Sequence, residues 1–312
     1  MNVAVMGAGG VGGYLGGMLA RAGNQVTLIA RGEHLNAIRS HGLQLRTQQG
    51  EFTVKVNATD IPASVGPVEL ALFTVKTYHN QQAMEDMAPL VGRETTILTL
   101  QNGVTSYDQL SQKFGPDRVL PGAIYIETRV ESPGVIRQQG NVVRVVFGEV
   151  DGRETPRVRR IADTLAQAGV KVEVAQDIMK VLWTKFVFIV TLAGVTSLAR
   201  ANMDQLLSFP ESRQVVLDVL REAVAVGRAK GVRLDEDIVE RTMEYMQKEA
   251  KALRASMHND LERGRPLELD SLNGTVVRLA EELGVPVPTN RLIYSLLHVH
   301  DVNARRQYAR PV

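Results

Sequence analysis

The chain has 312 residues, with 36 Lys and Arg against 34 Asp and Glu, a net charge of +2 and 44% hydrophobic residues. This length favours two domains, and the near-neutral charge without a basic block argues against nucleic acid as a partner. The absence of cysteine excludes disulfides, thiol catalysis and thiolate metal sites. No basic and apolar leader precedes the first strand, so we expect no signal peptide and a cytoplasmic location.

The first predicted element is a short apolar strand that runs directly into glycines with the spacing G-x-G-x-x-G. In a dinucleotide-binding fold, the first glycine permits a tight turn, the second lets the backbone approach a pyrophosphate, and the third lets the following helix pack on the strand. The alternative is a glycine-rich helix start without a ligand, and Gly13, Gly16 and Gly17 are assigned to close packing. We expect a dinucleotide to bind through Gly7, Ala8, Gly9, Gly10, Val11 and Gly12.

A second apolar strand is predicted at residues 25–30, and Arg31 follows it directly. In this fold the residue at that strand end meets the adenine ribose, where an acidic side chain would bind the 2′-hydroxyl of NAD. Arg31 is instead a cation suited to a 2′-phosphate, so we expect a preference for NADP. Glu33 weakens this interpretation slightly, and the alternative is a solvated surface arginine.

Polar residues follow two further apolar strands, predicted at residues 68–75 and 95–100. Lys76 comes after the first, and Gln101, Asn102 and Gly103 come after the second. Ligands bind at the carboxyl ends of strands in open α/β sheets, so we expect Lys76 to face cofactor or substrate and Asn102 to hold one of them. The alternatives are a solvated strand end for Lys76 and simple turn chemistry for Asn102.

The remaining pattern of the first half predicts hairpins, one helix and a final strand. One hairpin is expected around residues 49–50, and another is expected between strands at 134–138 and 142–147, with its turn at 139–141. A helix is predicted at 153–168 and an edge strand at 170–175. Strand signals then stop, so we place a domain boundary after Gln176, giving domains at 1–176 and 177–312.

The second half is helical almost to its end. Residues 186–199 are uncharged but shorter than the ~20 residues that span a bilayer, which favours a buried core helix over a membrane segment. Lys185 stands at the head of this run, where it either reaches solvent from a helix end or faces a polar cleft. Further helices are predicted at 217–230, at 235–253 with Asp235 as a cap, from 268 to about 283, and at 289–302.

No metal signature appears among the six histidines, and no Ser/His/Asp or H-E-x-x-H pattern is present. Asp270 and Asn273 are candidates to bond the loop before them, or to serve only structure. The long apolar helices would suit pairing in a homodimer, although core packing explains them equally well.

Taken in order, the motifs of the chain resemble those of the ketopantoate reductase (2-dehydropantoate 2-reductase) family nearly end to end. No single motif is decisive, but the ordered set is specific. It comprises the GAGGVGG turn, Arg31, Val75-Lys76, Gln101-Asn102-Gly103, residues 133–136 before Phe147-Gly148-Glu149, Trp183-Thr184-Lys185, Ser256-Met257, and Glu268-Leu269-Asp270 before Asn273-Gly274.

The resemblance implies an NADPH-dependent reductase with a Rossmann-type first domain and an all-helical second domain. By analogy with the family, Lys185 is the general acid and Glu268 is a catalytic and substrate-binding partner. Asn102 and Ser256 then contact the substrate, and Lys76 lies by the cofactor. We therefore expect the reduction of ketopantoate to pantoate in pantothenate biosynthesis.

The chain departs from the family at two positions. The family commonly carries Asn four and eight residues after the lysine, on the same helical face, whereas this chain has Ile189 and Ala193. These side chains cannot hydrogen-bond a substrate hydroxyl, and an unpaired buried hydroxyl costs roughly 1–3 kcal/mol. The alternatives are therefore a more apolar 2-oxo acid or an imine as substrate, or a non-catalytic NADPH-binding protein.

Overall fold

The structure is a computed structural model that describes residues 1–249, 251 and 253–308. The chain divides into two compact units. The first comprises residues 1–101 and 106–178, and the second comprises residues 102–105 together with the described residues from 179 onward. The division thus falls after Ile178, whereas the sequence suggested Gln176, and the short segment that begins with Asn102 belongs with the helices.

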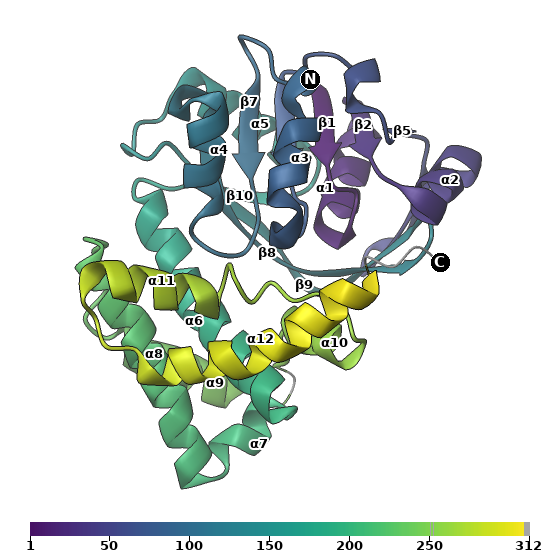
Figure 1. The fold of residues 1–312 in the computed structure, drawn as a ribbon. Coiled ribbons are helices and arrows are strands. Elements are labelled where there is room, and N and C mark those ends of the chain that lie inside the picture. Colours follow the sequence, from purple (N-terminus) through teal and green to yellow (C-terminus); the bar gives the residue numbers. More distant parts are fainter. Residues whose placement is uncertain (250, 252, 309–312) are drawn as a thin grey trace. The chain divides into compact units, whose positions relative to one another are not determined.

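The first unit is built on a ten-stranded sheet with the order β4-β3-β9-β8-β7-β6-β1-β2-β5, from which β10 branches beside β9 (Figure 1). The run β5-β2-β1-β6-β7-β8 is entirely parallel, and the order reverses between β1 and β6. This is the arrangement of a dinucleotide-binding sheet, so the expected Rossmann-type α/β class is confirmed. The strands are β1 (Asn2–Met6), β2 (Gln25–Ile29), β3 (Leu43–Thr47), β4 (Gly50–Val54), β5 (Asn57–Thr59), β6 (Leu70–Phe73), β7 (Thr96–Thr99), β8 (Val119–Ser132), β9 (Val135–Phe147) and β10 (Lys171–Val174).

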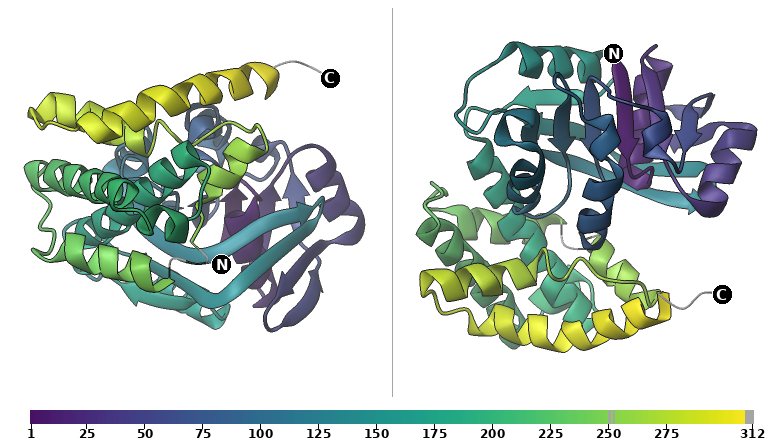
Figure 2. Two further views of the ribbon diagram at one scale, coloured as in Figure 1. Left: turned by 90° about the horizontal axis from the view of Figure 1, so that it is seen from below. Right: turned by 45° about the horizontal axis from the view of Figure 1, so that its top comes forward.

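The hairpin expected around residues 139–141 is wrong, because β9 runs through this segment as one strand beside β8 (Figure 2). The pairing jumps from Tyr125↔Arg144 to Glu127↔Gln139, so the extra residues of β9 form a bulge. Gly140 lies in this bulge with φ +72°. Both a hairpin turn and a bulge need a residue with positive φ, and glycine adopts that conformation most easily. A Gln-Gly-Asn sequence is therefore compatible with either structure.

Helix α1 (Gly10–Arg21) packs on the sheet through glycines. A Cβ atom on Gly13 would lie 2.8 Å from Ile136 of β9, and one on Gly17 would lie 2.9 Å from Leu45 of β3. These positions therefore set how close the helix lies to the strands, which agrees with their assignment to close packing. The other helices of this unit are α2 (Gly32–His41), α3 (Asn80–Asp86), α4 (Ser106–Phe114) and α5 (Pro156–Gln167), with short 3₁₀ turns at Pro62–Ser64, Thr77–His79, Ala88–Leu90 and Pro116–Arg118.

Within its described residues the second unit contains helices joined by loops and no strand, as expected. Its central helix, α6, extends over 22 residues, which is long and apolar enough to cross a membrane, yet 61% of its most apolar window is buried inside the protein. This burial agrees with a core helix. The helix is longer than the apolar run at residues 186–199, so its burial rather than its length favours a core position. The helices are α6 (Ile178–Ala199), α7 (Met203–Leu207), α8 (Pro210–Ala229), α9 (Ile238–Glu249), α10 (Ser256–Glu262), α11 (Asn273–Leu283) and α12 (Pro288–Tyr308).

Two helix starts differ from the sequence prediction. Helix α9 begins at Ile238, so Asp235 is not its cap; the Asp235 carboxylate instead pairs with Lys180 of α6 and Arg241 of α9. Residues 268–272 form turns, and α11 starts only at Asn273. The predicted end of the helix near residue 253 falls partly on residues 250 and 252, outside the described part of the chain.

Candidate active site

The glycine turn lies between β1 and α1, where the strand order of the sheet reverses. Gly7 adopts φ +99°, a conformation that favours glycine, and Ala8 N–H donates to Ile29 O at the end of β2. Thr74, directly after β6, donates its hydroxyl to the Gly7 carbonyl at 2.9 Å. The turn is therefore clamped by the ends of both neighbouring strands. Ligands bind at such a switch point in open α/β sheets.

The glycines of this turn have different surroundings. A Cβ atom on Gly12 would overlap the Gly7 carbonyl oxygen and the Thr74 hydroxyl, so this position serves packing. A Cβ atom on Gly9 would meet nothing within 4 Å. Gly9 is also the N-cap residue of α1, which has no side-chain cap and no acidic residue in its first turn. The helix start thus presents backbone N–H groups beside open space, which suits a pyrophosphate.

His34 braces the same turn from α2, a role that the sequence did not suggest. Its Nδ1 accepts a hydrogen bond from Gly134 N–H at 3.0 Å, and its Nε2 lies 2.9 Å from the Ala8 carbonyl oxygen. Nδ1 must therefore be unprotonated, and Nε2 carries the proton that it donates to Ala8. Burial lowers the pKa of His34, although its hydrogen bond to Ala8 opposes this effect.

Arg31 lies directly after β2 as the N-cap residue of α2, as the sequence suggested. Its side chain is 65% exposed and forms an ion pair with Asp86, at the end of α3, with a separation of 2.6 Å. Asp86 also accepts from Gln82 at 2.8 Å. The guanidinium is thus held by an acidic partner that the sequence did not reveal.

Lys76 lies after β6, directly before the 3₁₀ turn at Thr77–His79. Its backbone is extended and the residue is partly buried. The ends of β6 and β7 are joined beside it by Gln101, whose amide donates to Val75 O at 2.6 Å and to Asn80 Oδ1 at 2.7 Å. Gln101 therefore organises this strand edge, whereas the sequence pointed only to its neighbours.

The second unit brings three of the predicted residues together. Lys185 Nζ donates to Asn102 Oδ1 at 3.0 Å, across 83 positions of sequence. The negative charge of Glu268 also acts on Lys185. Lys185 lies about two turns inside α6, so the alternative of a side chain reaching solvent from a helix end is wrong.

The environment of Lys185 changes its acidity. Burial lowers the pKa of Lys185 to about 8, and the Glu268 carboxylate opposes this shift. An ammonium with such a pKa still carries its proton near neutral pH and releases it readily. It therefore suits both stabilisation of an oxyanion and proton donation.

The remaining candidates of the second unit have distinct positions. Ser256 is the exposed first residue of α10, while Glu268 is 7% exposed between the fully buried Leu267 and Leu269. The side chains of Asp270 and Asn273 bond to α12: Asp270 accepts from Tyr294 OH at 3.0 Å, and Asn273 donates to Asn290 Oδ1 at 3.0 Å. Both residues thus tie this segment to α12.

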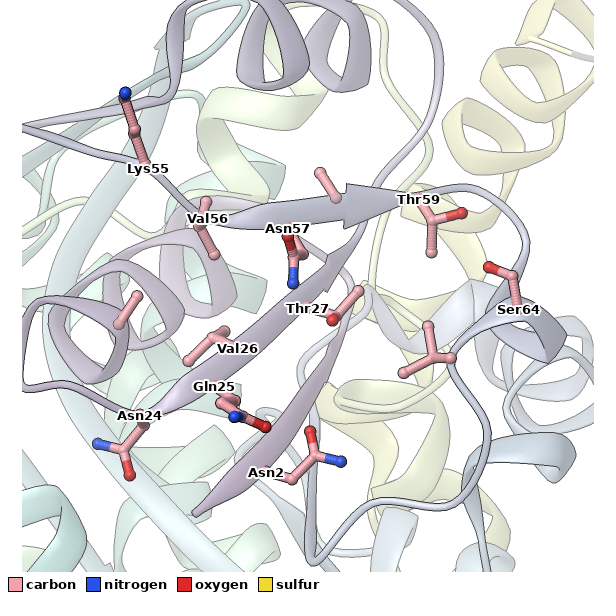
Figure 3. Close-up of a pocket in the computed structure, with 13 residues that line it drawn as sticks. Asn2, Asn24, Gln25, Val26, Thr27, Lys55, Val56, Asn57, Thr59 and Ser64 are labelled. Carbon is pink, nitrogen blue, oxygen red and sulfur yellow. The ribbon is translucent and has the colours of Figure 1, made fainter.

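Among the cavities of the first unit, one of about 800 Å³ lies at the starts of β1 and β2 and along β5 (Figure 3). Asn2, Gln25 and Asn57 are among its polar lining residues. It begins at the amino ends of the parallel strands, opposite to the edge that carries the glycine turn. Within the described residues, no group of three His, Asp or Glu side chains could hold a metal.

Comparisons with known proteins match both halves of the chain. A family model described as ketopantoate reductase PanE/ApbA matches residues 3–152, and the model of its C-terminal domain matches residues 177–301. The chain is 29% identical over 301 residues to an uncharacterized oxidoreductase, YkpB, of Bacillus subtilis, covering 96% of this chain and 99% of that one. It is 31% identical to a 2-dehydropantoate 2-reductase of Halobacterium salinarum, with coverage of 96% and 98%.

A solved structure gives the same result. The crystal structure of a PanE/ApbA family ketopantoate reductase from Ralstonia eutropha is similar with a TM-score of 0.91 and 35% identity, over 98% of this chain and 100% of that one. Both units of the chain thus have counterparts within one known protein.

Proposed function

Because the chain belongs to the ketopantoate reductase PanE/ApbA family, we propose that it reduces 2-dehydropantoate to pantoate with NADPH. Members of this family are oxidoreductases that act on 2-oxo acids. The observation that carries the proposal is Lys185, a partly buried ammonium bonded to Asn102 and acted on by Glu268. A lysine of lowered pKa with a specific charged partner is typical of catalytic sites, which favours an enzyme over a binding protein.

The open space at Gly9 and the uncapped start of α1 support the dinucleotide. Residues 7–12 would hold its pyrophosphate, with Lys76 and Asn102 nearer the reacting end. When bound, NADPH supplies a hydride to the ketone carbon. Arg31 would bind the 2′-phosphate, so Arg31→Ala should raise KM for NADPH about tenfold while leaving KM for NADH unchanged. An equal rise for both cofactors would contradict this role for Arg31.

The chemistry of the reduction then rests on the second unit. Lys185 stabilises the negative charge that develops on the carbonyl oxygen and donates the proton that completes the alcohol. Asn102 orients the Lys185 ammonium through the 3.0 Å hydrogen bond and, with Ser256, holds the substrate carboxylate. Glu268 keeps Lys185 protonated at neutral pH, because its negative charge raises the lysine pKa.

A second substrate class is favoured by Ile189 on α6. Ile189 is partly buried, whereas Ala193 is 1% exposed, so Ile189 is the position that retains access to a ligand. An apolar side chain there suits a 2-oxo acid without a distal hydroxyl. The second candidate activity is therefore the reduction of a more apolar 2-oxo acid by the same Lys185.

We include a cytoplasmic location and a homodimer in the proposal. The exposed apolar side chains of α12, Leu292, Leu296 and Val299, recur at helical spacing and support self-association. Light scattering should give a mass near 68 kDa, about twice the chain mass of 34.2 kDa.

The activity is tested by NADPH oxidation with ketopantoate, 2-oxoisovalerate and pyruvate. Lys185→Ala should lower turnover about 10²–10³-fold while NADPH binding, followed by nucleotide fluorescence, persists. Selective turnover of ketopantoate by the wild type supports the first candidate. Preference for 2-oxoisovalerate, reversed in Ile189→Asn, supports the second. NADPH binding without turnover on any 2-oxo acid would overturn both.

A further inference from the structure

The segment that carries Glu268 is held from one side by helix α12. Asp301, which is 1% exposed, accepts a hydrogen bond from Leu267 N–H at 2.7 Å through Oδ1. Its second oxygen accepts from Arg305 Nε at 2.8 Å. A buried carboxylate is costly unless it is paired, and here both oxygens have partners.

The hold on this segment extends past Glu268. Arg305 Nη2 lies 3.5 Å from both the Leu267 carbonyl oxygen and Asp270 Oδ2, and Tyr294 OH donates to Asp270 Oδ1 at 3.0 Å. The residues before and after Glu268 are thus bonded to three side chains of α12. The network acts on residues 267 and 270, so its effect on Lys185 would pass through Glu268.

We propose that Asp301 is a positioning residue for the reduction, which fixes the Glu268 carboxylate beside the Lys185 ammonium by anchoring the Leu267 backbone. The proposal rests on the proposed function for its catalytic consequence. Removal of the carboxylate frees Leu267 N–H and removes the Asp301 end of the Arg305 ion pairs, while the pair with Asp270 stays. Glu268 then gains freedom to retreat from Lys185, and the lysine loses part of the charge that keeps it protonated.

The matched control is Glu222 on α8, which secures the other end of α12. Its carboxylate accepts from Thr289 N–H at 2.9 Å, from Asn290 N–H at 2.8 Å and from the Asn290 side chain at 2.8 Å. Glu222→Ala should therefore loosen α12 without removing any contact to residues 267–270. A general loss of helix packing and a specific loss of Glu268 positioning are distinguished by this pair of variants.

The experiment compares Asp301→Ala, Asp301→Asn and Glu222→Ala in the full chain. The pKa of Lys185 is measured without turnover, from the pH dependence of its labelling by acetic anhydride in mass spectrometry, and kcat and KM are measured with the 2-oxo acid that the wild type prefers. Asp301→Ala should lower the Lys185 pKa and reduce kcat at pH 8 roughly three- to tenfold, with KM for NADPH unchanged. Asp301→Asn keeps an oxygen that can accept from Leu267 N–H, so its Lys185 pKa and its kcat should both lie close to the wild-type values.

Glu222→Ala should lower the melting temperature while leaving the Lys185 pKa and kcat close to wild type. The proposal is overturned if Asp301→Ala changes only the melting temperature, or if Glu222→Ala shifts the Lys185 pKa equally. If the wild type reduces no 2-oxo acid but Asp301→Ala still lowers the Lys185 pKa, the positioning role stands and the proposed function fails.

Discussion

The acidity of a single side chain sets the expected pH dependence of the proposed reduction, in which Lys185 is the acid. Burial lowers the pKa of Lys185 to about 8, and only the protonated lysine can act as the acid. We expect kcat to be constant near pH 7 and to fall about tenfold per pH unit above 8. Stopped-flow hydride-transfer rates over this range test the expectation. Lys185→Arg, which stays charged, should have a lower kcat that does not fall above pH 8. A wild-type kcat that falls only near the ordinary lysine pKa would contradict the lowered pKa of Lys185.

Two glycines of the turn should respond oppositely to the addition of one methyl group. Gly12→Ala places its Cβ on the Gly7 carbonyl and should reduce the free energy of unfolding by about 1–3 kcal/mol. Gly9→Ala meets nothing within 4 Å and should change stability by less than about 1 kcal/mol, yet weaken NADPH binding. Urea unfolding and NADPH titration of both variants separate packing from ligand contact. Equal destabilisation by the two would contradict the distinction.

The sequence could predict the glycine turn because strand, turn and helix are adjacent in the chain and their chemistry is local. It could not predict Thr74, His34 or Gln101 as braces, because their partners lie in other elements. The pairing of Lys185 with Asn102 joins residues 83 positions apart, and only the resemblance to a family suggested that they act together. The roles of the site residues stay predictions until the variants are measured.

At the scale of elements, the periodicity of the sequence predicted the order of strands and helices. It did not predict where the helices begin or where a strand contains a bulge. Residues 139–141 read as a turn because a left-handed glycine serves either structure, and only pairing with β8 decides for the bulge. Asp235 read as a helix cap because caps and ion-pair partners are the same residue types. Its actual partners, Lys180 and Arg241, come from the start of α6 and from α9.

The start of α12 depends on a carboxylate from another helix. Glu222 of α8 accepts from the backbone N–H groups of Thr289 and Asn290, which would otherwise lack partners at a helix start. Glu222→Ala should reduce the free energy of unfolding by about 1–3 kcal/mol. Glu222→Gln retains an acceptor and should lose less in guanidinium unfolding. A loss for Gln equal to that for Ala would show that charge, rather than hydrogen bonding, dominates.

For the whole molecule, each unit has its own buried core, so unfolding should not follow a single two-state transition. Trp183 is the only tryptophan and is fully buried in the second unit, so its fluorescence reports that unit alone. Circular dichroism reports both units. If residues 7–12 bind NADPH as proposed, saturating NADPH should raise the first-unit part of the circular dichroism transition more than the Trp183 transition. Identical shifts in both signals would show one cooperative unit instead.

The surroundings of Trp183 also constrain how this chain can change over evolutionary time. A Cβ atom on Gly227 of α8 would lie 2.8 Å from the Trp183 ring, and 2.9 Å from Leu234. The helix can therefore accept a larger residue at 227 only after the indole has been replaced by something smaller. Among descendants of this sequence, residues 183 and 227 should therefore change together. Lineages that keep the tryptophan should keep the glycine, and alanine should appear at 227 only where a smaller residue already stands at 183.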